Sequence, residues 1–122
     1  MKILGIDDNE DLLDLCETVL TSDGHEYTGI SDGKNGLEAI RDKKFDVVLL
    51  DLSMPDFSGS DVIDALAKDG IMNKQKVIIF TATTPTKEEI DLFLGKGAHS
   101  VLKQPIDEEF LLEFIHKLES ER

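Results

Sequence analysis

The chain has 122 residues, of which 40% are hydrophobic and 32% charged, a composition typical of one globular domain with its own core. Its formal net charge of −13 comes from 26 acidic and 13 basic residues, and such a surface disfavours nucleic acids and anionic membranes as partners. No apolar run approaches the roughly 18 residues that span a bilayer, and the N-terminus lacks a signal-peptide pattern. We therefore expect one cytoplasmic domain over residues 1–122, without membrane insertion or direct contact with nucleic acid.

The first predicted element is a short apolar strand at residues 2–6, which ends in Asp7 and Asp8. Asn9 then opens a helix, because apolar residues recur three and four positions apart from there until Asp23. The two adjacent carboxylates are either helix-initiating acids, which the helix dipole favours, or members of a site. This segment by itself leaves both interpretations open.

The third apolar run is the most informative stretch of the chain. A weaker strand at residues 25–30 and a short helix come before it. The run from Val47 to Leu50 then leads directly into Asp51, and a turn follows. An unbroken aliphatic run this short predicts a strand buried on both faces, with Asp51 where the strand leaves its sheet. Asp51 alone is compatible with a site or with a simple turn-initiating residue.

The remainder of the chain continues the alternation of helix and strand. Ser58 begins a third helix, and an apolar strand at residues 76–81 follows it. Thr86 starts the capping-box pattern of a fourth helix. A fifth strand at residues 99–104 and a last helix opened by Asp107 complete the pattern.

Five strands alternating with five helices predict a single α/β domain whose parallel sheet is covered on both faces. We expect a doubly wound, flavodoxin-like fold with strand order 2-1-3-4-5. Strands 1 and 3 are then neighbours at a topological switch point, which is where open α/β sheets bind ligands. Asp7, Asp8 and Asp51 should converge there.

Three carboxylates at one sheet edge repel one another. Two unit charges about 4 Å apart cost on the order of 4 kcal/mol at an effective dielectric constant near 20. The cluster therefore requires raised pKa values or a bound cation, and a small divalent ion such as Mg²⁺ suits oxygen ligands. A zinc site is disfavoured, because His25, His99 and His116 lie in different segments without metal-ligand spacing.

Thr81, at the end of the fourth strand, adds a hydroxyl near the predicted carboxylates. A hydroxyl and a metal ion on opposite sides of one aspartate can hold the oxygens of a phosphoryl group transferred to it. The alternative is that Thr81 is an ordinary β-branched residue at a strand end.

Taken together, these motifs resemble the receiver domain of two-component response regulators over essentially the whole chain. The resemblance is carried by an acidic pair after strand 1, Asp51 followed by Met-Pro-x-x-x-Gly, Thr-Ala after strand 4, and Pro105 after strand 5. It implies that Asp51 accepts a phosphoryl group from a histidine kinase or phosphotransfer protein. It also implies that Asp8 binds Mg²⁺, or Mn²⁺ in its place, together with Asp51 and the backbone carbonyl of Ser53, while Asp7 assists through water.

The same resemblance implies a switching role for residues near the other strands. Thr81 would be the switch hydroxyl, with Ala82 small enough to leave access to the site. In the family, movement of the threonine alters the surface formed by helix 4, strand 5 and helix 5, which would contact a downstream protein. Helices 4 and 5 are also a candidate homodimer surface. The resemblance implies a signalling phosphoacceptor that assists its own phosphotransfer and dephosphorylation rather than an enzyme.

The chain departs from the family where a lysine normally precedes the proline after strand 5. Counting forward from Gly97 or back from Pro105 places Gln104 at the lysine position, whereas the usual spacing from Thr81 points to Lys103. Adjacent strand residues face opposite sides, so one of the two faces the site. We expect Gln104 there, which removes a positive charge from the cluster.

A second departure is Val101, at a strand-5 position where many relatives have Tyr or Phe, and valine has little rotamer freedom to switch.

The sequence also leaves two rival functions open. One is a degenerate receiver, with Gln104 in place of the lysine, that acts as a constitutive docking module. The other is a phosphohydrolase with an aspartyl-phosphate intermediate, which is disfavoured because Ser53 lies where haloacid-dehalogenase-like enzymes place a second aspartate.

Overall fold

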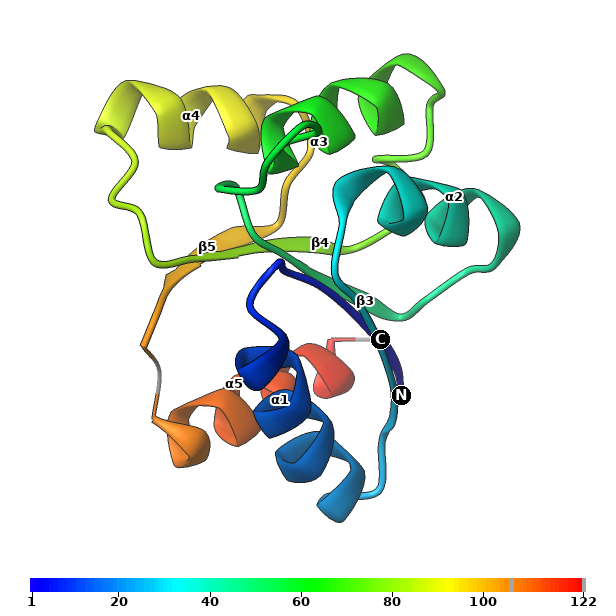
Figure 1. Ribbon diagram of the computed structural model, residues 1–122, viewed down its shortest axis with the longest axis vertical. Coiled ribbons are helices and arrows are strands. Elements are labelled where there is room, and N and C mark those ends of the chain that lie inside the picture. Colours follow the sequence, from blue (N-terminus) through cyan, green and yellow to red (C-terminus); the bar gives the residue numbers. More distant parts are fainter. Residues whose placement is uncertain (106, 122) are drawn as a thin grey trace.

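The computed structural model describes residues 1–105 and 107–121 and contains a five-stranded parallel sheet between two layers of helices (Figure 1). The sheet order is β2-β1-β3-β4-β5, so the predicted doubly wound topology is confirmed. The strands are β1 (Lys2–Ile6), β2 (Glu26–Ile30), β3 (Val47–Leu50), β4 (Val77–Thr81) and β5 (Ser100–Lys103). The helices are α1 (Glu10–Ser22), α2 (Gly33–Asp42), α3 (Gly59–Lys68), α4 (Lys87–Gly95) and α5 (Glu108–Ser120).

Side-chain caps explain where the helices begin. The Asn9 side chain accepts a hydrogen bond from the Leu12 N–H at the start of α1. Ser58 and Thr86 each form a complete capping box, in which the third helical residue bonds back to the cap. These bonds satisfy backbone donors that the first helical turn leaves unpaired, and they fix where the chain changes direction after β3 and β4.

Two hydrophobic cores lie on opposite faces of the sheet, because successive strand residues point to opposite sides. In β3, Val48 and Leu50 pack with α2, α3 and α4, whereas Val47 and Leu49 pack with α1 and α5. Figure 1 shows the same division, with α1 and α5 below the sheet and the other three helices above it. All four β3 residues are buried, as the unbroken aliphatic run predicts.

Several large apolar residues on the helices are exposed, among them Phe110 and Leu94. Phe110 in α5 is 52% exposed and Leu94 in α4 is 42% exposed, whereas their neighbours Leu111 and Phe93 are buried. Successive helical residues are about 100° apart around the axis, and here Leu111 and Phe93 join the two cores while their neighbours face solvent. No helix among the described residues is long and apolar enough to span a membrane.

Candidate functional site

Three carboxylates meet at the carboxyl edge of β1 and β3. Asp51 is joined to the end of β1, because its backbone N–H donates to the Ile6 carbonyl at 2.9 Å. One carboxylate oxygen from each of Asp7, Asp8 and Asp51 lies within 4.8 Å of the other two. Asp7 and Asp51 are only 5% and 7% exposed, whereas Asp8 is exposed to solvent. The convergence predicted from the strand order is therefore present.

Asp7 is held from two directions. Its Oδ1 accepts a 2.9 Å hydrogen bond from the Asn9 N–H, and its Oδ2 accepts a 3.0 Å hydrogen bond from Gln104 Nε2. Burial raises the pKa of Asp7 above its usual value, and the charges of Asp51 and Asp8 raise it further, while these two hydrogen bonds oppose the shift. Asp7 is thus a constrained carboxylate whose ionised form lacks full charge compensation.

Asp51 is positioned by the loop that follows β3. The Ser53 N–H donates to Asp51 Oδ1 at 3.2 Å, and Asp56 takes a left-handed conformation with φ of 65° that turns the chain toward α3. Burial raises the pKa of Asp51 and the charge of Asp8 adds to the increase, whereas the Thr81 hydroxyl and the Ser53 N–H lower it. Asp51 therefore carries an unfavourably buried charge at the edge of the sheet.

The close approach of Gly59 completes this loop. The Gly59 N–H donates to the Leu52 carbonyl at 3.1 Å. A Cβ on Gly59 would overlap the Asp51 carbonyl oxygen and lie 2.7 Å from the Leu52 Cα. Only glycine allows the start of α3 to pack this closely against the backbone of Asp51.

These donors suit a small divalent cation. The pKa values of Asp7 and Asp51 are raised, and Asp8 is exposed. Their carboxylate oxygens are the type of ligand that Mg²⁺ prefers, and a cation would offset the mutual repulsion of the three carboxylates. Asp7, Asp8 and Asp51 are therefore the residues that could hold Mg²⁺. The neighbouring Ser53 is exposed in the same loop.

Thr81 is fully buried at the end of β4, next in the sheet to β3. Its Oγ1 lies 2.9 Å from Thr83 Oγ1 and accepts a 3.2 Å hydrogen bond from the Thr83 N–H. Ala82, between them, is exposed. The Thr81 hydroxyl thus has a local partner on its own loop, which the sequence pattern did not predict.

Gln104 lies at the carboxylates and Lys103 lies away from them. Besides its bond to Asp7, Gln104 Nε2 donates to the Phe80 carbonyl at 2.9 Å, while the Lys103 ammonium donates to Thr84 Oγ1 at 2.6 Å. β5 ends at Lys103, and Gln104 continues alongside β4 because its N–H donates to the Thr81 carbonyl at 2.8 Å. Pro105 then ends the extended segment, through a cis peptide bond.

Val101 occupies the middle of β5, opposite Ile79 of β4. It is partly buried and packs against the core on the α2, α3 and α4 side of the sheet. The valine therefore fills its place within the packed structure, where its stiff χ1 angle restricts side-chain rotation.

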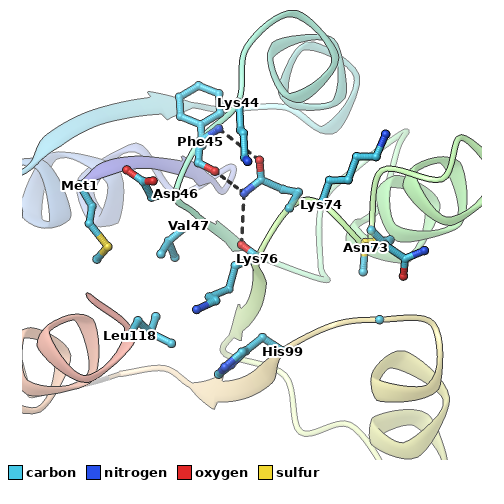
Figure 2. A pocket seen from close by; sticks show the side chains of 13 residues that line it. Met1, Lys44, Phe45, Asp46, Val47, Asn73, Lys74, Lys76, His99 and Leu118 are labelled. Atoms are coloured by element: carbon cyan, nitrogen blue, oxygen red, sulfur yellow. Dashed lines mark hydrogen bonds between the residues drawn. The ribbon is translucent and has the colours of Figure 1, made fainter. Parts of the chain in front are cut away.

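A separate pocket of about 330 Å³ lies near the amino ends of β3 and β4 (Figure 2). Its wall includes the buried Gln75, whose Nε2 donates to the Phe45 carbonyl at 2.8 Å and whose Oε1 accepts from the Phe45 N–H at 3.2 Å. These bonds satisfy the backbone of Phe45. Strand direction places this pocket at the edge opposite Asp51, so it has no part in the carboxylate site.

Sequence reasoning missed two features of the described residues. The backbone N–H of Asn9 donates to Asp7, while its side chain caps α1. The contact with Asp7 depends on the tight turn after β1, which the sequence pattern does not specify. Sequence spacing disfavours a zinc site at His25, His99 and His116, yet the fold brings His25 and His116 together with Asp23. Residues from a strand start and a distant helix carry no joint local signal, so the spacing argument could not detect them.

Comparison with known sequences identifies related proteins. The sequence model of the family described as "Response regulator receiver domain" matches residues 3–116. The chain is 34% identical over 117 residues to Protein PilH of Pseudomonas aeruginosa, a match that covers 94% of each chain. It is also 34% identical over 106 residues to the DNA-binding response regulator MtrA of Mycobacterium tuberculosis, covering 85% of this chain but only 44% of MtrA.

Solved structures show the same relationship. The receiver domain of the Francisella response regulator 1452 superposes with a TM-score of 0.84 at 27% identity, covering 96% of this chain and 94% of that one. The response regulator TrrA of Thermotoga maritima, in complex with Mg²⁺ and BeF, superposes with a TM-score of 0.82 at 26% identity, covering 96% and 97%.

Proposed function

The chain belongs to the response regulator receiver domain family, and from this we propose that it is a phosphoacceptor module of two-component signalling in which Asp51 receives the phosphoryl group. The observation that carries the proposal is the convergence of Asp7, Asp8 and Asp51 at one sheet edge, with Thr81 at the end of the adjoining strand. Asp51 is the member of the cluster that follows the central strand β3.

In the proposed reaction, a carboxylate oxygen of Asp51 attacks the phosphorus of a phosphohistidine in a kinase or phosphotransfer protein. The bond from phosphorus to the histidine nitrogen breaks, and an acyl phosphate forms on Asp51. Mg²⁺ held by Asp8, Asp51 and the Ser53 carbonyl, with assistance from Asp7, would neutralise charge on the phosphoryl oxygens. The protein assists its own phosphorylation and dephosphorylation and is not a dedicated enzyme.

The Thr81 hydroxyl provides the conformational part of the proposal. It is hydrogen-bonded to Thr83 and lies beside Asp51, so it can exchange the Thr83 partner for a phosphoryl oxygen. Ala82, which is exposed and small, leaves the site open to a phosphodonor. The exchange would shift the loop between β4 and α4 and so reach the surface formed by α4, β5 and α5.

That surface is proposed to bind a downstream protein. Leu92 and Leu94 in α4 and Phe110 in α5 are all more than two-fifths exposed, which supports a protein contact on these helices. The formal charge of −13 favours a partner with a basic contact surface, and not nucleic acid. A second copy of the chain is an alternative occupant of the same helices. The compartment proposed for this signalling is the cytoplasm.

A second candidate function is a docking module that works without phosphorylation. It is supported by Gln104, whose neutral amide already donates to Asp7 and the Phe80 carbonyl in place of a lysine that would pair with phosphoaspartate. In this case the output surface, formed by α4, β5 and α5, can bind its partner at all times, and phosphorylation of Asp51 makes no contribution to that binding.

Intact-mass measurement after incubation with acetyl phosphate and Mg²⁺ separates these functions. We expect one phosphate adduct per chain, absent from Asp51→Asn and retained in Asp14→Asn, which carries the same change on an exposed face of α1. Absence of any adduct, while the folded chain still binds Mg²⁺, would favour the docking module. Sustained turnover of a phosphomonoester would instead revive the phosphohydrolase reading.

A further inference from the structure

A second cluster of metal-ligating side chains lies apart from the carboxylate site. Asp23 follows the last residue of α1, His25 immediately precedes β2, and His116 lies in the second half of α5. Asp23 Oδ2 is 3.2 Å from His25 Nε2 and 2.6 Å from His116 Nε2. The two imidazole rings have their centroids 6.5 Å apart and are tilted by 51°. One ligand atom from each residue lies within 4.8 Å of the other two.

His25 is the member of this cluster that hydrogen bonding does not explain. Its side chain is only 4% exposed, and its Nε2 is buried with no hydrogen-bond partner among the described residues. Nε2 lies 3.2 Å from Asp23 Oδ2 but without the alignment of a hydrogen bond, while Nδ1 on the far side of the ring lies 3.0 Å from the Met1 amine. A buried nitrogen that lacks a hydrogen bond is unfavourable, so its position inside a ligand cluster points to a group that would bind it better than the Asp23 carboxylate does.

We propose that Asp23, His25 and His116 bind one divalent transition-metal ion, best matched by Zn²⁺, with a fourth position open to water. Two imidazole nitrogens and one carboxylate oxygen form a donor set that Zn²⁺ uses widely, whereas Mg²⁺ prefers oxygen alone. One ion would satisfy His25 Nε2 and keep the Asp23 carboxylate paired with both histidines.

The spacing of the ligand atoms agrees with this assignment. Ligands about 2.0–2.1 Å from a tetrahedral ion lie about 3.3 Å from each other. Asp23 Oδ2 and His25 Nε2 already have this separation, at 3.2 Å. The contact between Asp23 and His116 must lengthen from 2.6 Å, and the His116 side chain can withdraw because it is 56% exposed. That exposure also provides the entry path for the ion.

The site would link segments that are distant in the sequence. The ion would join the connection between α1 and β2 to α5, one of the helices of the proposed output surface. The proposed zinc site lies at the amino end of β2, whereas Asp7, Asp8 and Asp51 lie at the carboxyl ends of β1 and β3. The two sites therefore share no residue and lie at opposite edges of the sheet. Occupancy of the zinc site would restrict motion of α5 without involving Asp51.

Zinc binding by the whole chain tests the proposal when Mg²⁺ is present in excess to occupy the carboxylate site. Titration against a chromogenic zinc chelator, at about pH 8 where imidazole is ordinarily neutral, should give one equivalent bound. We expect His116→Gln and Asp23→Asn each to weaken zinc binding at least tenfold. His99→Gln is the matched control, because His99 lies outside the cluster and contacts Ser100 and Glu121.

Both variants alter exposed residues, so circular dichroism should show an unchanged fold. Nitrogen NMR of the imidazoles gives a second readout, in which Zn²⁺ should shift the His25 and His116 signals and leave His99 unaffected. Equal zinc affinity in the wild type and His116→Gln would overturn the proposal. Loss of zinc binding in Asp8→Asn with retention in His116→Gln would do the same, because it would assign the ion to the carboxylate site.

Discussion

Gln104 and Asp7, 97 residues apart in sequence, are joined by a hydrogen bond of 3.0 Å from the Gln104 side-chain amide to the Asp7 carboxylate. The same nitrogen donates to the Phe80 carbonyl at 2.9 Å, which holds the side chain at the end of β4. Gln104 therefore supplies a neutral donor to the acidic cluster and is anchored to Asp7 rather than to Asp51. This relationship distinguishes the site from the lysine arrangement that the family resemblance implies.

Replacing Gln104 with lysine should weaken Mg²⁺ binding and strengthen the response to phosphorylation. An ammonium beside Asp7 would compete electrostatically with the metal ion, and a loss of about 1.4 kcal/mol would correspond to a tenfold lower Mg²⁺ affinity. It would also provide a charged partner for the phosphoryl group. Isothermal titration with Mg²⁺, and NMR of the α4, β5 and α5 amides with and without beryllofluoride, would measure the two effects.

Lys103→Gln is the matched control for this change, because it alters one charge at the neighbouring residue, whose side chain points to Thr84. It should leave Mg²⁺ affinity within about twofold of the wild type, because exposed charges are strongly screened. An equally large beryllofluoride response in the wild type and Gln104→Lys would contradict the idea that the glutamine weakens switching.

Asp51→Asn should stabilise the metal-free protein at neutral pH. Burial raises the pKa of Asp51 in the folded state, so folding favours the protonated carboxyl, and the wild type loses stability as pH rises through the ordinary and then the raised pKa. The asparagine variant lacks this loss. Urea unfolding with a chelator should therefore show a stability difference at pH 7 that shrinks below about pH 4, the ordinary range of aspartate.

Adding Mg²⁺ should reduce or reverse that difference. An ion at 100 times its dissociation constant stabilises the folded state by about 2.7 kcal/mol, and the variant has lost one ligand. Asp14→Asn, on an exposed face of α1, should show no comparable dependence on pH or Mg²⁺. A metal-free Asp51→Asn variant that is less stable than the wild type at pH 7 would show that the buried charge is compensated.

Gly59→Ala should destabilise the loop that carries Asp51. The new methyl group would overlap the Asp51 carbonyl oxygen and lie 2.7 Å from the Leu52 Cα, and both are backbone atoms that cannot move independently. We expect a loss of about 2 kcal/mol in the free energy of unfolding, within the usual range for overpacking. Chemical denaturation would measure this loss.

Gly95→Ala is the corresponding control, since a Cβ at this exposed end of α4 would meet no atom within 4 Å. It should be neutral or stabilising by up to about 1 kcal/mol, because alanine favours helix more than glycine does. If both variants had the same stability, the close packing at Gly59 would have no energetic weight.

Gln75→Leu should cost about 2–4 kcal/mol of unfolding free energy. The leucine preserves much of the volume but leaves the buried N–H and carbonyl of Phe45 without the partners that Gln75 provides. Thermal and urea unfolding would measure the effect, with Asn73→Ala as an exposed control on the same pocket wall. A loss of less than about 0.5 kcal/mol, which is the size expected for an exposed surface substitution, would show that water replaces the glutamine.

The sequence by itself determined the elements and their order. Aliphatic runs such as Val47 to Leu50 specify strands buried on both faces, and caps such as Asn9 and Thr86 specify where helices begin. Right-handed crossovers then leave few possible topologies, so the meeting of Asp7 and Asp51 follows from local pattern and chain chirality.

Only the tertiary structure decided which side chains contact one another across that frame. Gln104 bonds to Asp7, and His25 meets His116 around Asp23, because loop paths, side-chain rotamers and the packing of α5 bring them together. Periodicity assigns a residue to a face but not to a partner, since the 3.6-residue and two-residue repeats contain no information about distant segments. The convergence of Asp7, Asp8 and Asp51 was therefore predictable from the sequence, whereas the glutamine contact to Asp7 and the histidine cluster required the folded chain.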